Sequence, residues 1–133
     1  MPERVLYLDS SALVKDVLPE AETLALLRFL AGYRQRVSSA LAKVEVMRAA
    51  ARSSDSGAVA RAAQVLARTT LVDISDTILS RAAQVPPLRL RSLDAIHLAT
   101  ALTLGADLDG LVTYDERLAE GARLAGVTVY TPR

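Results

Sequence analysis

The sequence predicts an α/β fold: one domain with a central, mainly parallel β-sheet flanked by helices. Short apolar runs, such as 5–8 and 111–113, alternate along the chain with longer segments whose apolar residues have helical spacing. This alternation is typical of a parallel sheet with helices on both faces. The 133 residues are about the size of one domain, and no linker, repeat or low-complexity segment divides them. We therefore expect a single domain over residues 1–133.

The first predicted elements are a buried strand and two helices. The apolar run 5–8 predicts the strand, and Asp9 follows it as the N-cap of a short helix at about 11–18. A second helix, at about 20–33, is indicated by leucines at helical spacing and by a glycine near its end.

The middle of the chain repeats this order. Residues 36–38 form a short strand, after which the serines at 38 and 39 can cap a helix at about 40–52. The segment SSDSG is a turn, and further elements follow as a helix at 58–68, a strand at 70–73 and a helix at 76–85 that Pro86 and Pro87 end.

The last third contains the most apolar helix, which starts within LRSLDAIHLATAL with Ser92 as its expected N-cap. A loop at 105–110, a strand at 111–113, a helix at 116–124 and a strand at 127–129 complete the prediction. The 127–129 strand would be the last of the sheet.

Composition excludes several classes of protein. The chain has no cysteine, which excludes disulfides and thiolate metal sites and fits a reducing compartment. No apolar run approaches the roughly 20 residues of a membrane helix, and the N-terminus lacks a signal peptide. A net charge of +1 does not by itself indicate a polyanion partner. We expect a soluble, cytoplasmic protein that binds no membrane.

Two acidic residues follow predicted strands. Asp9 ends the first strand, and Asp115 follows the strand at 111–113. Ligands of open parallel sheets bind outside the carboxyl ends of the strands, so these two acids could share one crevice. Each could equally do no more than cap the helix after it.

Two further acids lie on predicted helices. Glu45 borders an apolar face and could simply pair with Arg48 one turn along. Asp94 is favoured by the helix dipole, which does not explain why a carboxylate opens so apolar a helix. His97 lies one turn beyond Asp94, and we expect it to be a structural hydrogen-bonding residue rather than a metal ligand. Carboxylates are ligands that Mg²⁺ prefers, although spacing alone cannot establish that these four meet.

Four segments in this order resemble the PIN domain family, and specifically VapC-type toxins of type II toxin–antitoxin systems. They are YLDSSALVK, SSALAKVEVMRA, LDAIHLATAL and LVTYDERLAEGA, and together they span essentially the whole chain. The resemblance implies a Mg²⁺-dependent endoribonuclease, with Mn²⁺ as a substitute. It implies that the catalytic and metal-binding residues are Asp9, Glu45, Asp94 and Asp115.

The same resemblance implies supporting residues and partners. Thr113 matches a polar position that supports the last acid, and Ser10 and Glu116 are further supporting candidates. Arg48, Arg91 and Arg117 are candidates for binding RNA phosphates, with Arg34, Arg36, Lys43, Arg52 and Arg89 as further cations. The implied substrate is a structured RNA such as tRNA or rRNA. The implied partners are a VapB-type antitoxin and a second copy of the chain.

Large apolar residues of the first two helices offer a surface for the antitoxin. They are Leu13, Val14, Val17, Leu24, Leu27 and Leu30, and the core could instead take all six.

Two other classes of protein are alternatives. A catalytically silent PIN-like module that binds RNA or protein is the main alternative. A phosphoacceptor receiver domain would need an acidic pair after its first strand, where this chain has Asp9-Ser10-Ser11.

Overall fold

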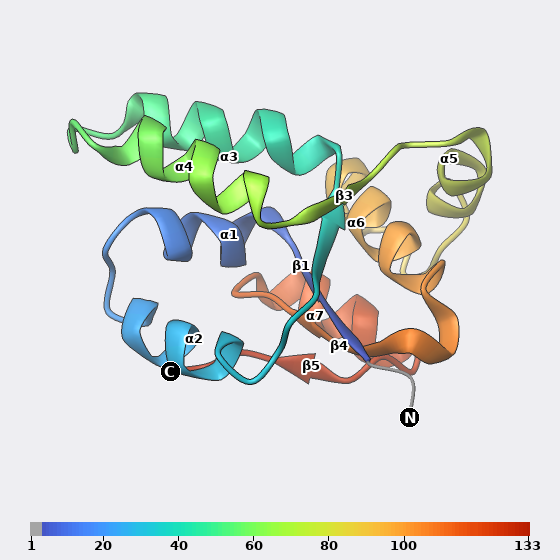
Figure 1. Ribbon diagram of the computed structural model, residues 1–133. Helices are drawn as coiled ribbons and strands as arrows, with labels where there is room; N and C mark the ends of the chain where they lie inside the picture. Colours follow the sequence, from blue (N-terminus) through green and yellow to red (C-terminus); the bar gives the residue numbers. More distant parts are fainter. Residues whose placement is uncertain (1–3) are drawn as a thin grey trace.

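The computed structural model describes residues 4–133 and confirms the α/β class. Five strands form one sheet in the order β3-β2-β1-β4-β5, and every neighbouring pair is parallel (Figure 1). The strands are β1 (Val5–Leu8), β2 (Arg36–Ser39), β3 (Thr70–Val72), β4 (Leu108–Val112) and β5 (Val129–Tyr130). The helices are α1 (Ser10–Val17), α2 (Thr23–Leu30), α3 (Leu41–Arg52), α4 (Ala58–Ala67), α5 (Asp76–Ala82), α6 (Ser92–Leu102) and α7 (Glu116–Leu124), with a 3₁₀ turn η1 (Gly105–Asp107). Of the predicted domain, residues 1–3 lie outside this description.

Helices cover both faces of the sheet, and alternate residues of the central strand β1 pack against the helices of opposite faces. Leu6 and Leu8 pack into one apolar cluster with α1, α2, α3 and α4. Val5 and Tyr7 point to the opposite face and pack into a second cluster with α6 and α7. All four residues of β1 are buried, which explains why the strand is a continuous apolar run.

The order of the strands reverses beside β1. The chain builds β2 and β3 on one side of β1, and then β4 and β5 on the other side. The carboxyl ends of β1 and β4 therefore flank a topological switch point, where open α/β sheets bind ligands. Asp9 and Asp115 follow these two strands.

The predicted elements are confirmed in kind, with differences at their ends. The prediction that Ser92 caps α6 was wrong, because Arg91 is the N-cap and its side chain makes no capping hydrogen bond. Neither predicted serine is the N-cap of α3, which is Ala40. Ser39 nevertheless accepts a hydrogen bond from the Leu41 amide, while Ser38 is fully buried. The segment 105–110 is not one loop, because β4 begins at Leu108 by pairing with β1.

The sheet is enclosed by helices that are short. Over residues 4–133 no helix has both the length and the apolar character needed to cross a bilayer.

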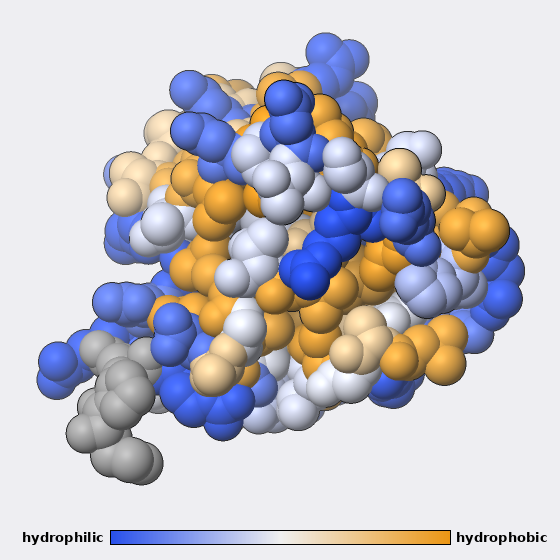
Figure 2. All heavy atoms as spheres, turned by 90° about the vertical axis from the view of Figure 1, so that its right-hand side faces the viewer, coloured by the Kyte–Doolittle hydropathy of each residue, from blue (hydrophilic) through white to orange (hydrophobic). Residues whose placement is uncertain are grey.

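Figure 2 shows the side of the molecule that carries α5 and α6, where apolar surface reaches solvent between charged side chains. Leu79 and Leu93 are among the exposed large apolar residues on these two helices.

Candidate active site

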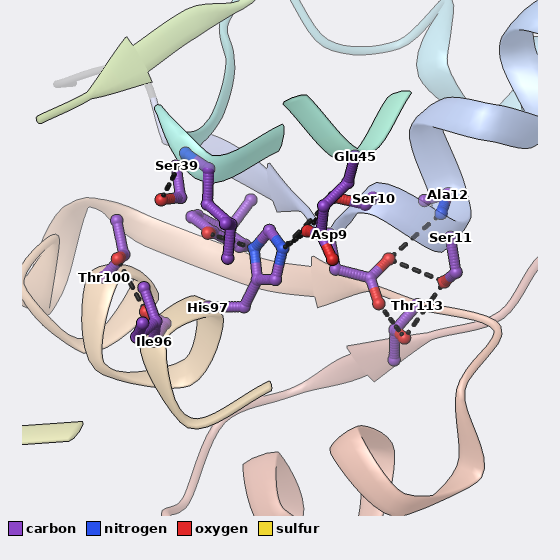
Figure 3. A network of polar contacts seen from close by, with 12 residues as sticks. Asp9, Ser10, Ser11, Ala12, Ser39, Glu45, Ile96, His97, Thr100 and Thr113 are labelled. Atoms are coloured by element: carbon purple, nitrogen blue, oxygen red, sulfur yellow. Dashed lines mark hydrogen bonds and ion pairs between the residues drawn. The ribbon is translucent and has the colours of Figure 1, made fainter. Parts of the chain in front are cut away.

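Asp9 is held at the end of β1 by three hydrogen bonds. Its Oδ1 accepts from the Ala12 amide at 3.0 Å and from the Ser11 hydroxyl at 2.7 Å, while its Oδ2 accepts from the Thr113 hydroxyl at 2.6 Å (Figure 3). Asp9 is only 3% exposed. Burial raises the pKa of the Asp9 carboxyl, although these hydrogen bonds and nearby His97 oppose the rise.

Thr113 joins Asp9 to Asp115 at the ends of β1 and β4. Its hydroxyl oxygen accepts a hydrogen bond from the Asp115 amide at 3.0 Å while it donates to Asp9. Asp115 is the N-cap of α7, and its Oδ1 accepts from the amides of Arg117 and Leu118. Both aspartates therefore cap the helices that follow them, as the sequence predicted. The Thr113 bridge nevertheless brings them to one edge of the sheet.

Glu45 reaches the same edge from α3. Its Oε1 accepts a hydrogen bond from the Ser10 hydroxyl at 2.6 Å and lies 2.9 Å from His97 Nε2 (Figure 3). The alternative of a simple pairing with Arg48 does not hold, because Glu45 pairs with His97, which lies far away in the sequence. Partial burial alone would raise the pKa of Glu45, but the hydrogen bonds from His97 and Ser10 outweigh it and lower that pKa.

Asp94 brings the fourth carboxylate from the first turn of α6. Burial is the largest cause that raises its pKa, and the negative charges of Asp115, Asp9 and Glu45 raise it further, against a smaller opposing effect of His97. The other three predicted acids therefore lie near enough for their charges to act on Asp94. A carboxylate is tolerated here because it remains only partly buried and lies in the first turn of α6, where the helix dipole favours negative charge.

The donor set suits a hard divalent cation, because carboxylates are the ligands that Mg²⁺ prefers. The mutual repulsion that raises the pKa of Asp94 is also what a bound cation would relieve. In residues 4–133, however, no three Asp, Glu or His side chains converge closely enough to form a ready-made cation site. The residues therefore fit a cation in their chemistry, while their side chains are not yet arranged around one.

Two of the three arginines predicted to bind RNA lie beside this edge. Arg91 and Arg117 line a hollow of about 340 Å³ together with Asp115 and Glu116. Arg48 is exposed on α3 and does not line this hollow. Glu116 is highly exposed and lies 3.9 Å from Arg133.

Sequence reasoning missed Tyr7, whose hydroxyl lies 2.7 Å from Nδ1 of His97. In the sequence Tyr7 is one of four consecutive apolar strand residues, so no pattern marks it as different. The expectation that His97 is a structural hydrogen-bonding residue agrees with its contacts: it is 2% exposed and joins Tyr7, Ser10 and Glu45.

Comparison with known proteins gives matches along almost the whole chain. The PIN domain family profile matches residues 6–124. Ribonuclease VapC46 of Mycobacterium tuberculosis is 47% identical over 129 residues, which cover 96% of this chain and 97% of the relative. A solved toxin–antitoxin complex from Klebsiella pneumoniae contains a chain that superimposes with a TM-score of 0.71 at 25% identity, covering 96% of this chain and 98% of that one. The M. tuberculosis toxin VapC20, described as cleaving the sarcin–ricin loop, shares the fold with a TM-score of 0.73 at 17% identity, covering 96% of this chain and 99% of VapC20.

Proposed function

The chain belongs to the PIN domain family and, within it, to the VapC-type toxins, and from this we propose that it hydrolyses phosphodiester bonds in RNA with Mg²⁺ or Mn²⁺ as cofactor. The observation that carries the proposal is that Thr113 joins Asp9 to Asp115 at the switch point of the sheet, with Glu45 and Asp94 near enough for the acidic charges to act on Asp94. The 47% identity to a ribonuclease over nearly the whole chain supports RNA as the substrate.

We assign Asp9, Asp94 and Asp115 to holding the cation, with Glu45 acting on it through water. A divalent cation bound here supplies positive charge against the negative charge that develops on the phosphoryl oxygens. The chain's own residues keep the acids in place: Thr113 joins Asp9 to Asp115, and Ser10 donates to Glu45. Glu45 stays ionised because hydrogen bonds from His97 and Ser10 lower its pKa. Both of these bonds go to Oε1, so Oε2 is the oxygen available to orient water.

The hollow beside Asp115 is the part of the surface best suited to RNA phosphates. Arg91 and Arg117 line it and are exposed, so their guanidinium groups can bind phosphates without losing a buried partner. We assign Arg48 a weaker, peripheral contact. We propose a structured RNA, such as tRNA or rRNA, as the substrate in the cytoplasm, since the recognition of such RNAs depends on shape around the crevice.

A VapB-type antitoxin and a second copy of this chain are the proposed protein partners. The similarity to a chain of a toxin–antitoxin complex supports the antitoxin. Leu13, Val17 and Leu30 are buried in the core, so they cannot form its binding surface. Leu24 and Leu27 are 58% and 42% exposed on α2 and remain available for it.

RNA cleavage by the purified, antitoxin-free protein tests the proposal. We expect cleavage with Mg²⁺ that leaves 5′-phosphate and 3′-hydroxyl ends, none in EDTA, and recovery when Mn²⁺ is added. Asp9→Asn should abolish cleavage, whereas Asp107→Asn, on the exposed turn η1, should leave it unchanged. RNA binding without cleavage by the folded wild type, with any metal, would instead identify a silent PIN-like binding module.

A further inference from the structure

A buried imidazole separates the acidic edge from the core beneath it. His97 is 2% exposed and extends from α6 between Tyr7 of β1 and Glu45 of α3. Its Nδ1 lies 2.7 Å from the Tyr7 hydroxyl, and its Nε2 lies 2.9 Å from Glu45 Oε1. Each ring nitrogen therefore has its own partner, on opposite sides of the ring.

The partner of Nδ1 fixes the orientation of the imidazole ring. Tyr7 has no exposed surface, and its hydroxyl lies 2.7 Å from Nδ1. This buried contact holds the ring at one rotation, in which Nε2 is turned toward Glu45.

The surroundings of Nε2 indicate that this nitrogen carries a proton. The Ser10 hydroxyl donates its own proton to Glu45 Oε1 at 2.6 Å, so its oxygen can only accept from Nε2 at 3.2 Å. The Glu45 carboxylate is also an acceptor. Nε2 thus faces two acceptors and must carry the proton.

We propose that Tyr7 and His97 are positioning residues of the active site: Tyr7 fixes the rotation of the His97 ring, and the Nε2 proton of His97 fixes Glu45. The inference rests on the proposed function only in assigning Glu45 to the cation site. The Nε2 proton itself follows from the contacts of Ser10 and Glu45.

The chain contains a single histidine, so its imidazole signals can be assigned without ambiguity. Long-range ¹H–¹⁵N correlation spectra of the metal-free, ¹⁵N-labelled protein at neutral pH show which ring nitrogens carry a proton. We expect a proton on Nε2 in the wild type and shifted imidazole signals in Tyr7→Phe, in which Nδ1 loses its partner. The matched control is Tyr33→Phe, which removes a tyrosine hydroxyl bonded to Asp109 and should leave the imidazole signals unchanged. A wild-type ring without a proton on Nε2, or a Tyr7→Phe spectrum identical to wild type, would overturn the proposal.

A second arm tests positioning through Mn²⁺ affinity, measured by calorimetry. The variants His97→Gln and His97→Asn both replace the ring with an amide, but only glutamine is long enough to place a donor near the position of Nε2. Glu45 acts on the cation through water, so losing the group that orients Glu45 should weaken Mn²⁺ binding no more than Glu45→Gln does. We expect a loss as large as that of Glu45→Gln in folded His97→Asn and an affinity near wild type in His97→Gln. Equal losses in both variants, with melting curves that show folded protein, would contradict positioning through Nε2.

These readouts separate the two proposals. If the wild type carries the Nε2 proton but cleaves no RNA, the proposed function fails and the arrangement of Tyr7, His97 and Glu45 stands. If RNA is cleaved and Nε2 carries no proton, only the positioning role fails.

Discussion

Asp94 carries a negative charge where burial and three neighbouring acids oppose it. Its pKa is raised in the folded protein, so the folded state retains a proton that the unfolded state has already lost. As pH rises from the ordinary aspartate value through the raised value, this group therefore lowers the free energy of unfolding. At neutral pH the whole penalty is present, and at acid pH below both values it vanishes.

We therefore expect Asp94→Asn to melt at a higher temperature than the wild type at neutral pH without metal. The difference should shrink as the pH falls below the ordinary aspartate value, because Asp94 is then protonated in both states. Melting curves recorded from acid to neutral pH, in EDTA, check this. A variant that melts lower than the wild type at neutral pH would show that Asp94 does not repel its neighbours.

Single residues were predictable from sequence only in part. Asp9 and Asp115 could be identified because strand ends and helix caps leave local signals, and the structure places both as caps. The partner of Glu45 could not be found, because the pattern offers only its neighbours along the helix, while His97 arrives from α6. Tyr7 gave no signal at all.

At the scale of elements, the close approach of β5 to β4 at Gly110 constrains the sheet. A Cβ there would lie 2.9 Å from the Thr128 carbonyl oxygen and would also meet the Tyr130 ring. Gly110→Ala must push β5 away from β4, and overpacking of this kind typically costs about 1–3 kcal/mol. Only glycine lets the two strands approach at this point.

Denaturant unfolding measures this effect. Gly110→Ala should lower the free energy of unfolding by that amount, whereas Gly32→Ala, where the nearest atom lies at 3.7 Å, should leave it nearly unchanged. Equal effects of the two substitutions would refute the close approach.

Most helices and strands could be predicted, because apolar period and turn residues are local. The helix at 116–124 agrees with α7 at both ends, since Asp115 caps it. The start of β4 was missed because its first residues include Asp109 and Gly110, which are not typical of a buried strand; pairing with β1 overrides their preference.

At the scale of the whole molecule, the order of the strands creates the site. Local pattern predicts parallel strands but not which of them are neighbours, so it could not establish that β1 and β4 are adjacent. That adjacency brings the acids after both strands together, and α3 and α6 then add theirs. The resemblance to the PIN family supplied what spacing alone lacked.

The proposed antitoxin surface is also a property of the assembled molecule. Leu27→Asp should weaken binding of a co-expressed VapB-type antitoxin while leaving stability nearly unchanged, because Leu27 is already 42% exposed. Leu88→Asp, at a leucine that is 81% exposed elsewhere, is the matched control. Co-purification and thermal melting measure the two effects. Retention of antitoxin by folded Leu27→Asp, equal to that of the control, would place the partner on another surface.

The central claim is that four carboxylates from different elements act as one cation site. The most direct measurement is calorimetric titration of Mn²⁺ into the wild type and into Asp9→Asn, Glu45→Gln, Asp94→Asn and Asp115→Asn, with Asp107→Asn as the control. We predict weakened binding in all four variants, least in Glu45→Gln because its contact is through water, and wild-type affinity in the control. Mn²⁺ binding that is absent from the wild type, or unchanged in the Asp9, Asp94 and Asp115 variants, would contradict the account.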